Sequence, residues 1–411
     1  MWYRIGLSAL MFNLAFFCPE YCGVLILFFL VPLVGVARAS RHAGRDGFMW
    51  GLCTFGPHFS WLLLVVLRHS SAHWLLAVLI YSVVVTCFSL SSGLWLWSAA
   101  RFFSGTRKIF WFVGVSLVYW FVAIDWVVRP LGFVGYPFIN PLVPLAAYRP
   151  FLRIVSLCAM MVVGKQTTVH DVEGLGYCPP VVNRVMNADA AWRRNPYGVG
   201  QKIYEQFVRL HAQQLSAPRA TIWVTPESMF CFPLNYYPCV IAQWDRACAL
   251  NEHVLMGSVI ERDGRFFQAV FWLHKGLIIK FYVKKLLTPF VEKMPPSWRR
   301  VSALKKAFIG DTVEFCDGVD TCGVSFFDME NNLRVVPRIC LEFFFCQPHD
   351  FDDVRKGTRN VWVFLFANDS WFDGVFRKIL FLSAQLKANY IHLPVVYCGH
   401  FGYHKIIPET I

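Results

Sequence analysis

Long apolar runs in the first 165 residues restrict the possible folds of this chain more than any other feature. Six such runs lie at about 5–17, 22–37, 48–67, 73–98, 109–128 and 137–163, separated by short polar or basic links. A helix that crosses a bilayer needs about 20 mainly apolar residues. The third, fourth and fifth runs reach that length, and we expect the shorter first two to form a tight hairpin around Cys18-Pro19-Glu20. Residues 1–165 are therefore predicted to form a transmembrane helical bundle of five to six hydrophobic segments.

A cleaved signal peptide is the alternative interpretation of residues 1–22. No small-x-small cleavage site follows the first apolar run, and further runs come after it. The composition also favours a membrane protein, because 56% of the residues are hydrophobic and only 16% are charged, against about 25% charged in soluble proteins. We therefore expect the first run to remain part of the bundle.

The basic residues between the runs indicate the orientation of the bundle. Two links, 38–45 and 101–108, carry several arginines and lysines, whereas the link 18–22 carries none. The positive-inside rule places both basic links and the N-terminus in the cytoplasm. Six crossings would then leave the rest of the chain in the cytoplasm, and five would leave it outside. The sixth run contains Arg149, Pro150 and Arg153, and its uninterrupted part, 151–163, is short for a span, so the count stays open at this point.

Charge and cysteine usage exclude several other classes of protein. The net charge of +13 comes from residues that are scattered or lie between apolar runs, so we expect no nucleic-acid partner, and anionic membrane lipids are the expected counterpart. None of the 14 cysteines forms a CxxC pair. We therefore predict neither a metal site nor a disulfide framework.

From residue 166 to 411 the pattern changes to short β-rich runs that alternate with amphipathic helical stretches such as 204–215, which predicts an α/β layered domain. Three of its runs end in polar residues that could carry chemistry. Glu227 follows the run 220–225, Lys284 and Lys285 follow the run 276–283, and Cys340 follows the run 333–339. A surface glutamate, solvated loop charges and a buried structural cysteine are the ordinary interpretations of each residue alone.

The ordered combination of the three resembles the nitrilase, or carbon-nitrogen hydrolase, superfamily, whose glutamate, lysine and cysteine lie in this order at strand ends. With the preceding bundle, the chain is similar to the apolipoprotein N-acyltransferase family. Lys284 lies five residues before Pro289-Phe290, as in the lysine loop of that family, and we therefore choose it over Lys285. Other matching motifs are Gly47-Phe-Met-Trp-Gly-Leu52, Gly132-Phe-Val-Gly-Tyr-Pro-Phe138, Pro226-Glu227-Ser228 and Asn368-Asp-Ser-Trp-Phe372.

The resemblance implies a fold, a set of site residues and a reaction. The fold would be an αββα sandwich attached to the membrane bundle. Cys340 would be the nucleophile, Glu227 the general base and Lys284 the stabiliser of the oxyanion, with no metal and no cofactor. An acyl chain would pass from a phospholipid, through a Cys340 thioester, to the N-terminal amine of a diacylated lipoprotein. The supporting residues would be Glu292, Glu342, Asn368 and Trp371.

The sequence departs from the family at two positions near these residues and at its end. Val291 stands where the family has glycine, and Leu341 stands where it has an aromatic residue. We also expect the chain to lack the family's final transmembrane helix. Because the lipoprotein substrate lies outside the bacterial cytoplasmic membrane, we expect five crossings and a domain on the outer, periplasmic face. A membrane-anchored amidase of the nitrilase type and an inactive scaffold of the same fold remain the alternatives.

Overall fold

The computed structural model describes residues 1–69, 74–102, 116, 140, 142–163, 175–177, 195–213, 222–230, 232–247, 252–289, 292–294, 314–318, 326–328, 333–356, 360–372 and 374–409. They belong to two compact units. The first unit includes Met1–Leu152 and Phe372–Leu386, and the second includes Arg153–Pro296, Asp311–Trp371 and Lys387–Ile411. The predicted boundary after residue 165 stays a prediction. Apart from Ser116, the fifth apolar run lies outside the described residues.

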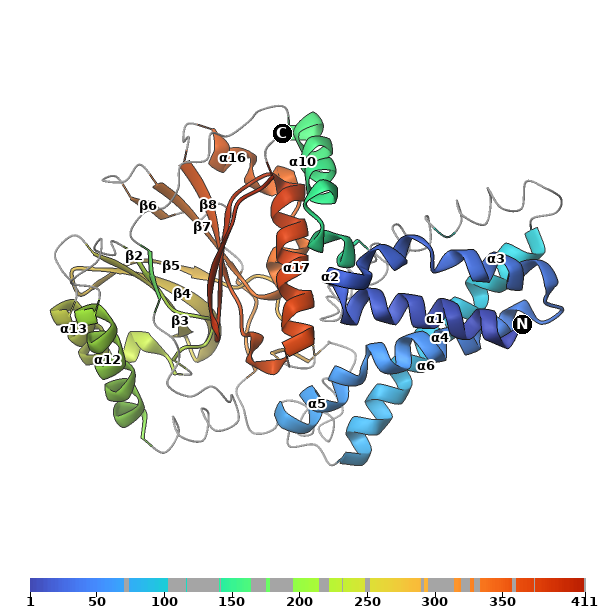
Figure 1. Ribbon diagram of the computed structural model, residues 1–411. Helices are drawn as coiled ribbons and strands as arrows, with labels where there is room; N and C mark the ends of the chain where they lie inside the picture. The colour runs from blue at the N-terminus through green and yellow to red at the C-terminus, as the bar shows by residue number, and fades with distance from the viewer. Residues whose placement is uncertain are drawn as a thin grey trace. The chain divides into compact units, whose positions relative to one another are not determined.

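The described part of the first unit is helical (Figure 1). Its elements are α1 (Trp2–Phe17), α2 (Pro19–Cys22), η1 (Gly23–Leu27), α3 (Leu30–Ala39), α4 (Ala43–His58), α5 (Ser60–His69), α6 (Trp74–Phe102) and η3 (Pro144–Ala147). The chain reverses between α1 and α3, which pack against each other as the predicted hairpin. The second apolar run is longer than we expected, because its helical stretch already begins at Pro19.

Two stretches of the described chain, Pro19–Ala39 and Trp74–Arg101, are long and apolar enough to cross a membrane. A third exists if Ala43–His58 and Ser60–Leu67, which meet at an angle of 44°, count as one broken span. Pro57 lies inside α4 just before this bend, and proline bends a helix because it lacks an N–H and crowds the preceding turn. The total of five to six segments stays a prediction, since the structure describes only part of residues 103–141.

Glycines allow α4 and α6 to approach each other closely. A Cβ atom on Gly51 would lie 2.5 Å from Cα of Ser89, and a Cβ on Gly47 would lie 2.6 Å from the carbonyl oxygen of Ser92. Real side chains do not tolerate such distances, so these positions require glycine for the helices to keep their separation. Gly47 belongs to the segment Gly47–Leu52 noted above, and the close helix contact gives this glycine a structural reason.

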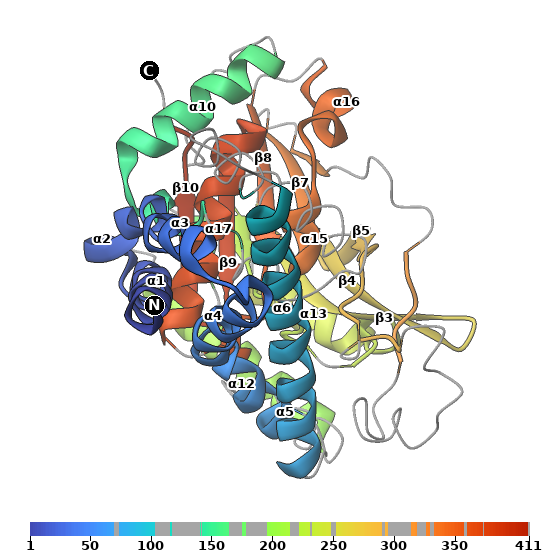
Figure 2. The ribbon, with the colours of Figure 1, turned by 90° about the vertical axis from the view of Figure 1, so that its right-hand side faces the viewer.

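Within its described residues, the second unit contains two five-stranded mixed sheets. The first has the order β1-β2-β3-β4-β5, and the second has the order β10-β9-β8-β7-β6. The strands are β1 (Leu175–Tyr177), β2 (Ile222–Val224), β3 (His253–Arg262), β4 (Arg265–His274), β5 (Leu277–Val283), β6 (Phe326–Asp328), β7 (Leu333–Ile339), β8 (Asn360–Phe366), β9 (Val395–Gly399) and β10 (Gly402–Ile406). β7, β8 and β9 run parallel at the centre of the second sheet (Figure 2).

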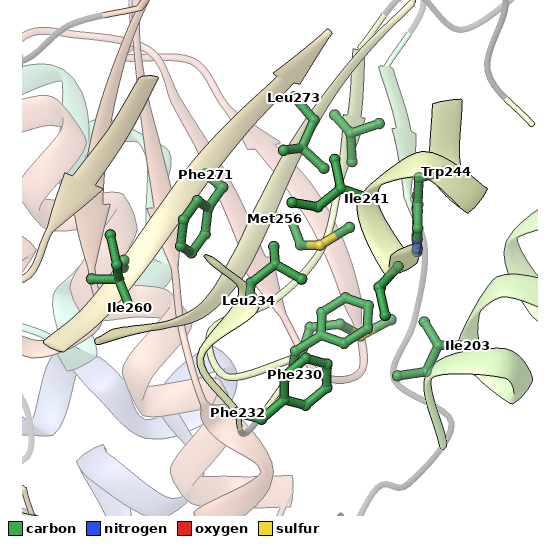
Figure 3. Close-up of a cluster of buried hydrophobic side chains, with 14 of the residues drawn as sticks. Ile203, Phe230, Phe232, Leu234, Ile241, Trp244, Met256, Ile260, Phe271 and Leu273 are labelled. Carbon is green, nitrogen blue, oxygen red and sulfur yellow. The ribbon is translucent and has the colours of Figure 1, made fainter. Parts of the chain in front are cut away.

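The two sheets face each other across one apolar core. Its buried members alternate along the strands of both sheets and include Val224, Val270, Tyr282, Val335, Phe364 and Val396. The opposite face of the first sheet is covered by α12 (Pro196–Gln213) and α13 (Pro238–Ala247), which share a second core with it (Figure 3). This order of helix pair, sheet and sheet confirms the predicted α/β layered domain. α12 begins eight residues before the predicted stretch 204–215, with Pro196 at its first position, where proline is favourable.

The remaining elements of this unit are short or lie near its ends. They are α10 (Arg149–Val163), which begins in the first unit, η5 (Leu234–Tyr236), α15 (Leu341–Phe345), η6 (Pro348–Phe351), α16 (Asp352–Arg355), η7 (Asp369–Trp371) and α17 (Gly374–Ile391), whose last five residues belong to the second unit. Strands β2, β3 and β5 run in one direction in the first sheet, as do β7, β8 and β9 in the second. Loops that follow the carboxyl ends of such strands commonly form binding sites.

Candidate active site

Glu227 lies in the turn after β2 and is buried, with 4% of its surface exposed. One carboxylate oxygen accepts a hydrogen bond of 2.9 Å from Nζ of Lys284, and the other accepts one of 3.0 Å from the main-chain N–H of Asn368. A Cβ atom on Gly257 of β3 would lie 3.0 Å from Cα of Glu227. The absence of a side chain at Gly257 therefore allows the glutamate turn to lie against this strand.

Lys284 directly follows β5 and is the most deeply buried charged residue of the site, with 1% of its surface exposed. Its Nζ lies 2.9 Å from the carboxylate oxygens of both Glu227 and Glu292. The second oxygen of Glu292 accepts a hydrogen bond of 2.7 Å from the main-chain N–H of Thr288, which fixes this carboxylate within the lysine loop. Tyr282 lies two residues before Lys284, near the end of β5, so the two side chains leave the extended backbone on the same face.

Cys340 occupies the turn between β7 and α15, as its position after an apolar run predicted. Its φ is +51°, a region that non-glycine residues rarely adopt and that commonly marks functional turns. The main-chain N–H of Cys340 donates a hydrogen bond of 2.7 Å to the carbonyl of Phe366 at the end of β8, which holds the turn against the neighbouring strand. The residue as a whole is partly exposed, whereas its thiol is buried.

Glu342 connects the cysteine turn to the lysine loop. Its carboxylate accepts hydrogen bonds from the main-chain N–H groups of Ile339, at 2.7 Å, and Lys285, at 2.9 Å. The hydroxyl of Tyr282 donates to the same carboxylate, at 2.9 and 3.1 Å from its two oxygens. Glu342 therefore fixes the residues that precede Cys340 and follow Lys284. Lys285 contributes its main chain here, whereas Lys284 contributes its side chain to the buried cluster.

Burial and charge shift the proton affinities of the three central groups. Burial raises the pKa of Glu227, the positive charge of Lys284 lowers it, and the negative charge of Glu292 raises it, with a raised pKa as the result. Burial lowers the pKa of Lys284, but Glu227 and Glu292 outweigh this and raise it well above the usual lysine value. Burial and the charge of Glu227 raise the pKa of Cys340, although Lys284 opposes them. Lys284 is therefore charged at neutral pH, and the Cys340 thiol is protonated.

The turn after β8 contributes the Asn368 N–H and a set of contacts that fix it. The side-chain oxygen of Asn368 accepts a hydrogen bond of 2.6 Å from Ser370, and Trp371 lies half-buried in the same turn. The buried Asp369 accepts hydrogen bonds from the main-chain N–H of His400, at 2.6 Å, and from the Tyr397 hydroxyl, at 3.3 Å. These contacts tie the end of β8 to the end of β9.

Three contributors were not predicted from the sequence: Tyr282, Asp369 and His400. Tyr282 could have been found, because it lies two residues before Lys284 in a strand and must share its face. His400 follows β9 in the same way that Cys340 follows β7 and Asn368 follows β8, but this relation becomes visible only once the strands are known to be parallel neighbours.

The arrangement combines the groups that nucleophilic acyl chemistry requires. The Cys340 thiol interacts with the Glu227 carboxyl and lowers its pKa, so the cysteine lies beside a group that can accept its proton. The buried ammonium of Lys284 interacts with the same thiol and can stabilise negative charge that develops beside it. Within the described residues, no group of three or more His, Cys, Asp or Glu side chains could hold a metal ion. Val291 lies outside the described residues, and Leu341 is buried in α15.

No protein-family model matches the sequence, and no curated protein matches it. Solved structures show limited likeness. A glutamine-dependent NAD+ synthetase from Acinetobacter baumannii is 14% identical over 49% of this chain and 34% of its own, with a TM-score of 0.33. A Saccharomyces cerevisiae protein described as a member of branch 10 of the nitrilase superfamily is 11% identical over 49% of this chain and 70% of its own, with a TM-score of 0.34.

A further solved structure is a CN-hydrolase superfamily protein from Xanthomonas campestris with an arsenic adduct in its active site. It is 14% identical over 48% of this chain and 72% of its own, with a TM-score of 0.31. Of the NAD+ synthetase described above, this chain spans about a third of the length. The likenesses cover half of this chain and assign it no activity.

Proposed function

We propose that this protein is a membrane-bound N-acyltransferase that forms a thioester at Cys340. The observation that carries the proposal is the buried Lys284 ammonium between the carboxylates of Glu227 and Glu292, beside a cysteine on a tight strand-to-helix turn. A buried charge of this kind is costly unless it is paired, and such clusters are typical of functional sites. The apolar stretches Pro19–Ala39 and Trp74–Arg101 support a substrate that resides in the membrane.

In the first half-reaction, Glu227 takes the thiol proton while the sulfur attacks the ester carbonyl of a phospholipid. The negative charge that develops on the carbonyl oxygen is stabilised by Lys284. The bond to the glycerol oxygen then breaks, the leaving alcohol receives the proton from Glu227, and the acyl chain remains on Cys340 as a thioester. Burial raises the pKa of Cys340, so the thiol still carries its proton before the reaction begins and needs Glu227 to remove it.

In the second half-reaction, the N-terminal amine of a diacylated lipoprotein attacks the thioester. Glu227 accepts a proton from the amine, the carbon–sulfur bond breaks, and the thiol regains a proton, so that the products are an amide and free Cys340. Both substrates carry acyl chains whose removal from lipid costs about 0.8 kcal/mol per CH₂ group. A domain attached to membrane helices can meet both without that cost. We place the domain on the outer face of the bacterial cytoplasmic membrane.

The test uses the full chain in lipid nanodiscs that contain a phospholipid with a labelled acyl chain. We expect hydroxylamine-sensitive label on the Cys340 peptide, and we expect Cys340→Ser to abolish this thioester. Cys239→Ser changes an exposed cysteine in the same unit and serves as the matched control. If wild-type protein never acquires a thioester label at Cys340, the proposal is wrong and the inactive scaffold is favoured.

Addition of a diacylated lipopeptide then separates the two enzyme classes. N-acylated lipopeptide supports acyl transfer, whereas release of free fatty acid alone would assign the chain to hydrolases of the amidase type. The orientation is tested separately with cysteines at the exposed positions His42 and Arg262 in a background that lacks other reactive thiols. The proposed topology requires a membrane-impermeant reagent to label these two positions from opposite sides of the membrane.

A further inference from the structure

His400 follows β9 and is buried, with 5% of its surface exposed. Its ring nitrogen Nε2 lies 2.9 Å from the main-chain carbonyl oxygen of Glu227. A carbonyl oxygen can only accept a hydrogen bond, so Nε2 must carry the hydrogen. Burial lowers the pKa of His400 to about 4, which leaves the ring neutral at pH 7 and therefore leaves Nδ1 without a hydrogen. In the part of the chain that the structure describes, Nδ1 has no hydrogen-bond partner.

A second contact fixes the histidine itself. Its main-chain N–H donates a hydrogen bond of 2.6 Å to Asp369, and the residue before Asp369, Asn368, donates its own N–H to the Glu227 carboxylate at 3.0 Å. Glu227 is thus held at both ends. The His400 side chain binds the main-chain carbonyl of Glu227. The turn at Asn368 and Asp369, which is bound to the His400 main chain, binds the Glu227 carboxylate.

The turn that carries Glu227 needs such support. Pro226 has no main-chain N–H to donate, and Ser228 has a φ of +55°, which is rarely adopted by residues other than glycine. A buried carbonyl without a donor is unfavourable, and a turn in a sparsely populated conformation persists only when its surroundings impose it. The His400 side chain supplies a donor to the carbonyl of this turn.

We infer that His400 is a positioning residue, which holds the Glu227 turn so that the carboxylate meets both Lys284 and the Cys340 thiol. The inference rests on the proposed function in treating Glu227 as the base, and it assigns to that base a partner 173 residues away. The alternative is a histidine that merely fills space between β9 and β2. The two alternatives differ in whether Nε2 is needed, because among the described residues Nε2 has a hydrogen-bond partner and Nδ1 has none.

Two amide side chains separate these alternatives. The amide nitrogen of glutamine can take the position of Nε2 of histidine, whereas that of asparagine is nearer to the position of Nδ1. His400→Gln therefore preserves the donor to Glu227, and His400→Asn removes it at a similar polarity. His400→Phe keeps the ring volume and removes both nitrogens, so a space-filling role would be satisfied best by this variant.

The measurement is the rate at which iodoacetamide alkylates Cys340 in the full chain, followed by mass spectrometry from pH 5 to 9. This reaction needs the thiol proton to leave but needs neither acyl donor nor acceptor. We expect His400→Asn and His400→Phe to slow alkylation about tenfold, since one hydrogen bond to a buried group is lost, and His400→Gln to stay within about twofold of wild type. The exposed Cys239 in the same sample provides the reference rate.

The pH profile adds a readout that a space-filling role would not change. The groups that act on Glu227 are Lys284, Glu292, Cys340 and His400. If the turn moves away from Lys284, the pKa of Glu227 rises and the acid limb moves to higher pH in the Asn and Phe variants. The inference is overturned if Gln and Asn slow the reaction equally, if Phe behaves like wild type, or if no variant has an effect. A chain that alkylates as expected but forms no thioester with phospholipid would refute the proposed function alone.

Discussion

Replacing Lys284 with methionine tests the electrostatic basis of the site. In the wild type, one cation lies 2.9 Å from each of two carboxylates, and the exposed fractions of the three residues are 1% for Lys284, 4% for Glu227 and 7% for Glu292. Methionine has a similar length and no charge, so the variant leaves two buried negative charges without a counter-charge. Breaking a buried ion pair by removing one partner costs about 3–5 kcal/mol. A domain of this size loses about 2–4 °C in melting temperature per kcal/mol, so we expect a decrease of about 6–20 °C.

The loss depends on pH in a direction that follows from the charges. Without Lys284, the pKa of Glu227 in the folded chain rises further, while in the unfolded chain it stays at about 4.3. Above about pH 4.3, Glu227 has released its proton in the unfolded chain but still holds it in the folded chain. The variant therefore loses stability as the pH rises toward the pKa of Glu227 in the folded chain. The melting temperature of Lys284→Met should therefore approach that of wild type near pH 4 and fall below it at pH 7.

Thermal unfolding of the detergent-solubilised full chain, followed by intrinsic tryptophan fluorescence, measures these differences. Lys285→Met is the matched control, because it removes a neighbouring lysine and keeps the main-chain N–H that Glu342 accepts. The double variant Lys284→Met/Glu292→Gln should recover part of the loss, since only one buried charge then lacks a partner. A melting temperature for Lys284→Met within about 2 °C of wild type at pH 7, or an equal decrease in the control, would refute the argument.

Three further predictions concern other parts of the chain. In Glu342→Gln an NH₂ group replaces one of the two oxygens that accept main-chain N–H groups, so two donors then face each other. We expect the free energy of unfolding to fall by about 2–3 kcal/mol, measured by chemical denaturation. His400 should contribute roughly 3 kcal/mol of stability that is lost as pH falls from 6.5 to 4, because His400 binds a proton in the unfolded chain but not in the folded one, and a His400→Gln variant should show a smaller pH dependence in the same titration. Gly51→Leu should separate α4 from α6 and lower the yield of folded protein in size-exclusion chromatography, whereas Gly56→Leu, whose Cβ would meet only the Tyr81 hydroxyl at 3.5 Å, should be tolerated.

The strand ends were the most predictable part of the candidate site. Glu227, Lys284 and Cys340 each follow an apolar or β-branched run, and this change from apolar to polar residues marks the place where a buried strand leaves the core. The family resemblance then distinguished Lys284 from Lys285, and the structure gives the two lysines different environments. The catalytic roles of these residues stay predictions that the labelling experiments address.

Contacts that join distant main-chain atoms were not predictable from sequence. His400 donates to a carbonyl group, which every residue possesses, so no pattern of side chains announces the partner. The bend before Phe59 was missed for a related reason, since the run 48–67 is apolar enough on average for one span and mean hydropathy does not register the local effect of Pro57. Both misses concern backbone geometry, which depends on tertiary context as well as on residue type.

The long separation between the residues that meet at Glu227 has a consequence for biosynthesis. The carboxylate binds an N–H that lies 141 residues later in the chain, and the carbonyl binds a side chain that lies 173 residues later. Contacts between such distant segments form late, because the entropy cost of closing a large loop comes before the contacts can stabilise the fold. An emerging chain therefore already carries Cys340 before His400 has been synthesised. The proposed nucleophile is present early, but the Glu227 turn acquires its final support only after the last parallel strand has joined the sheet.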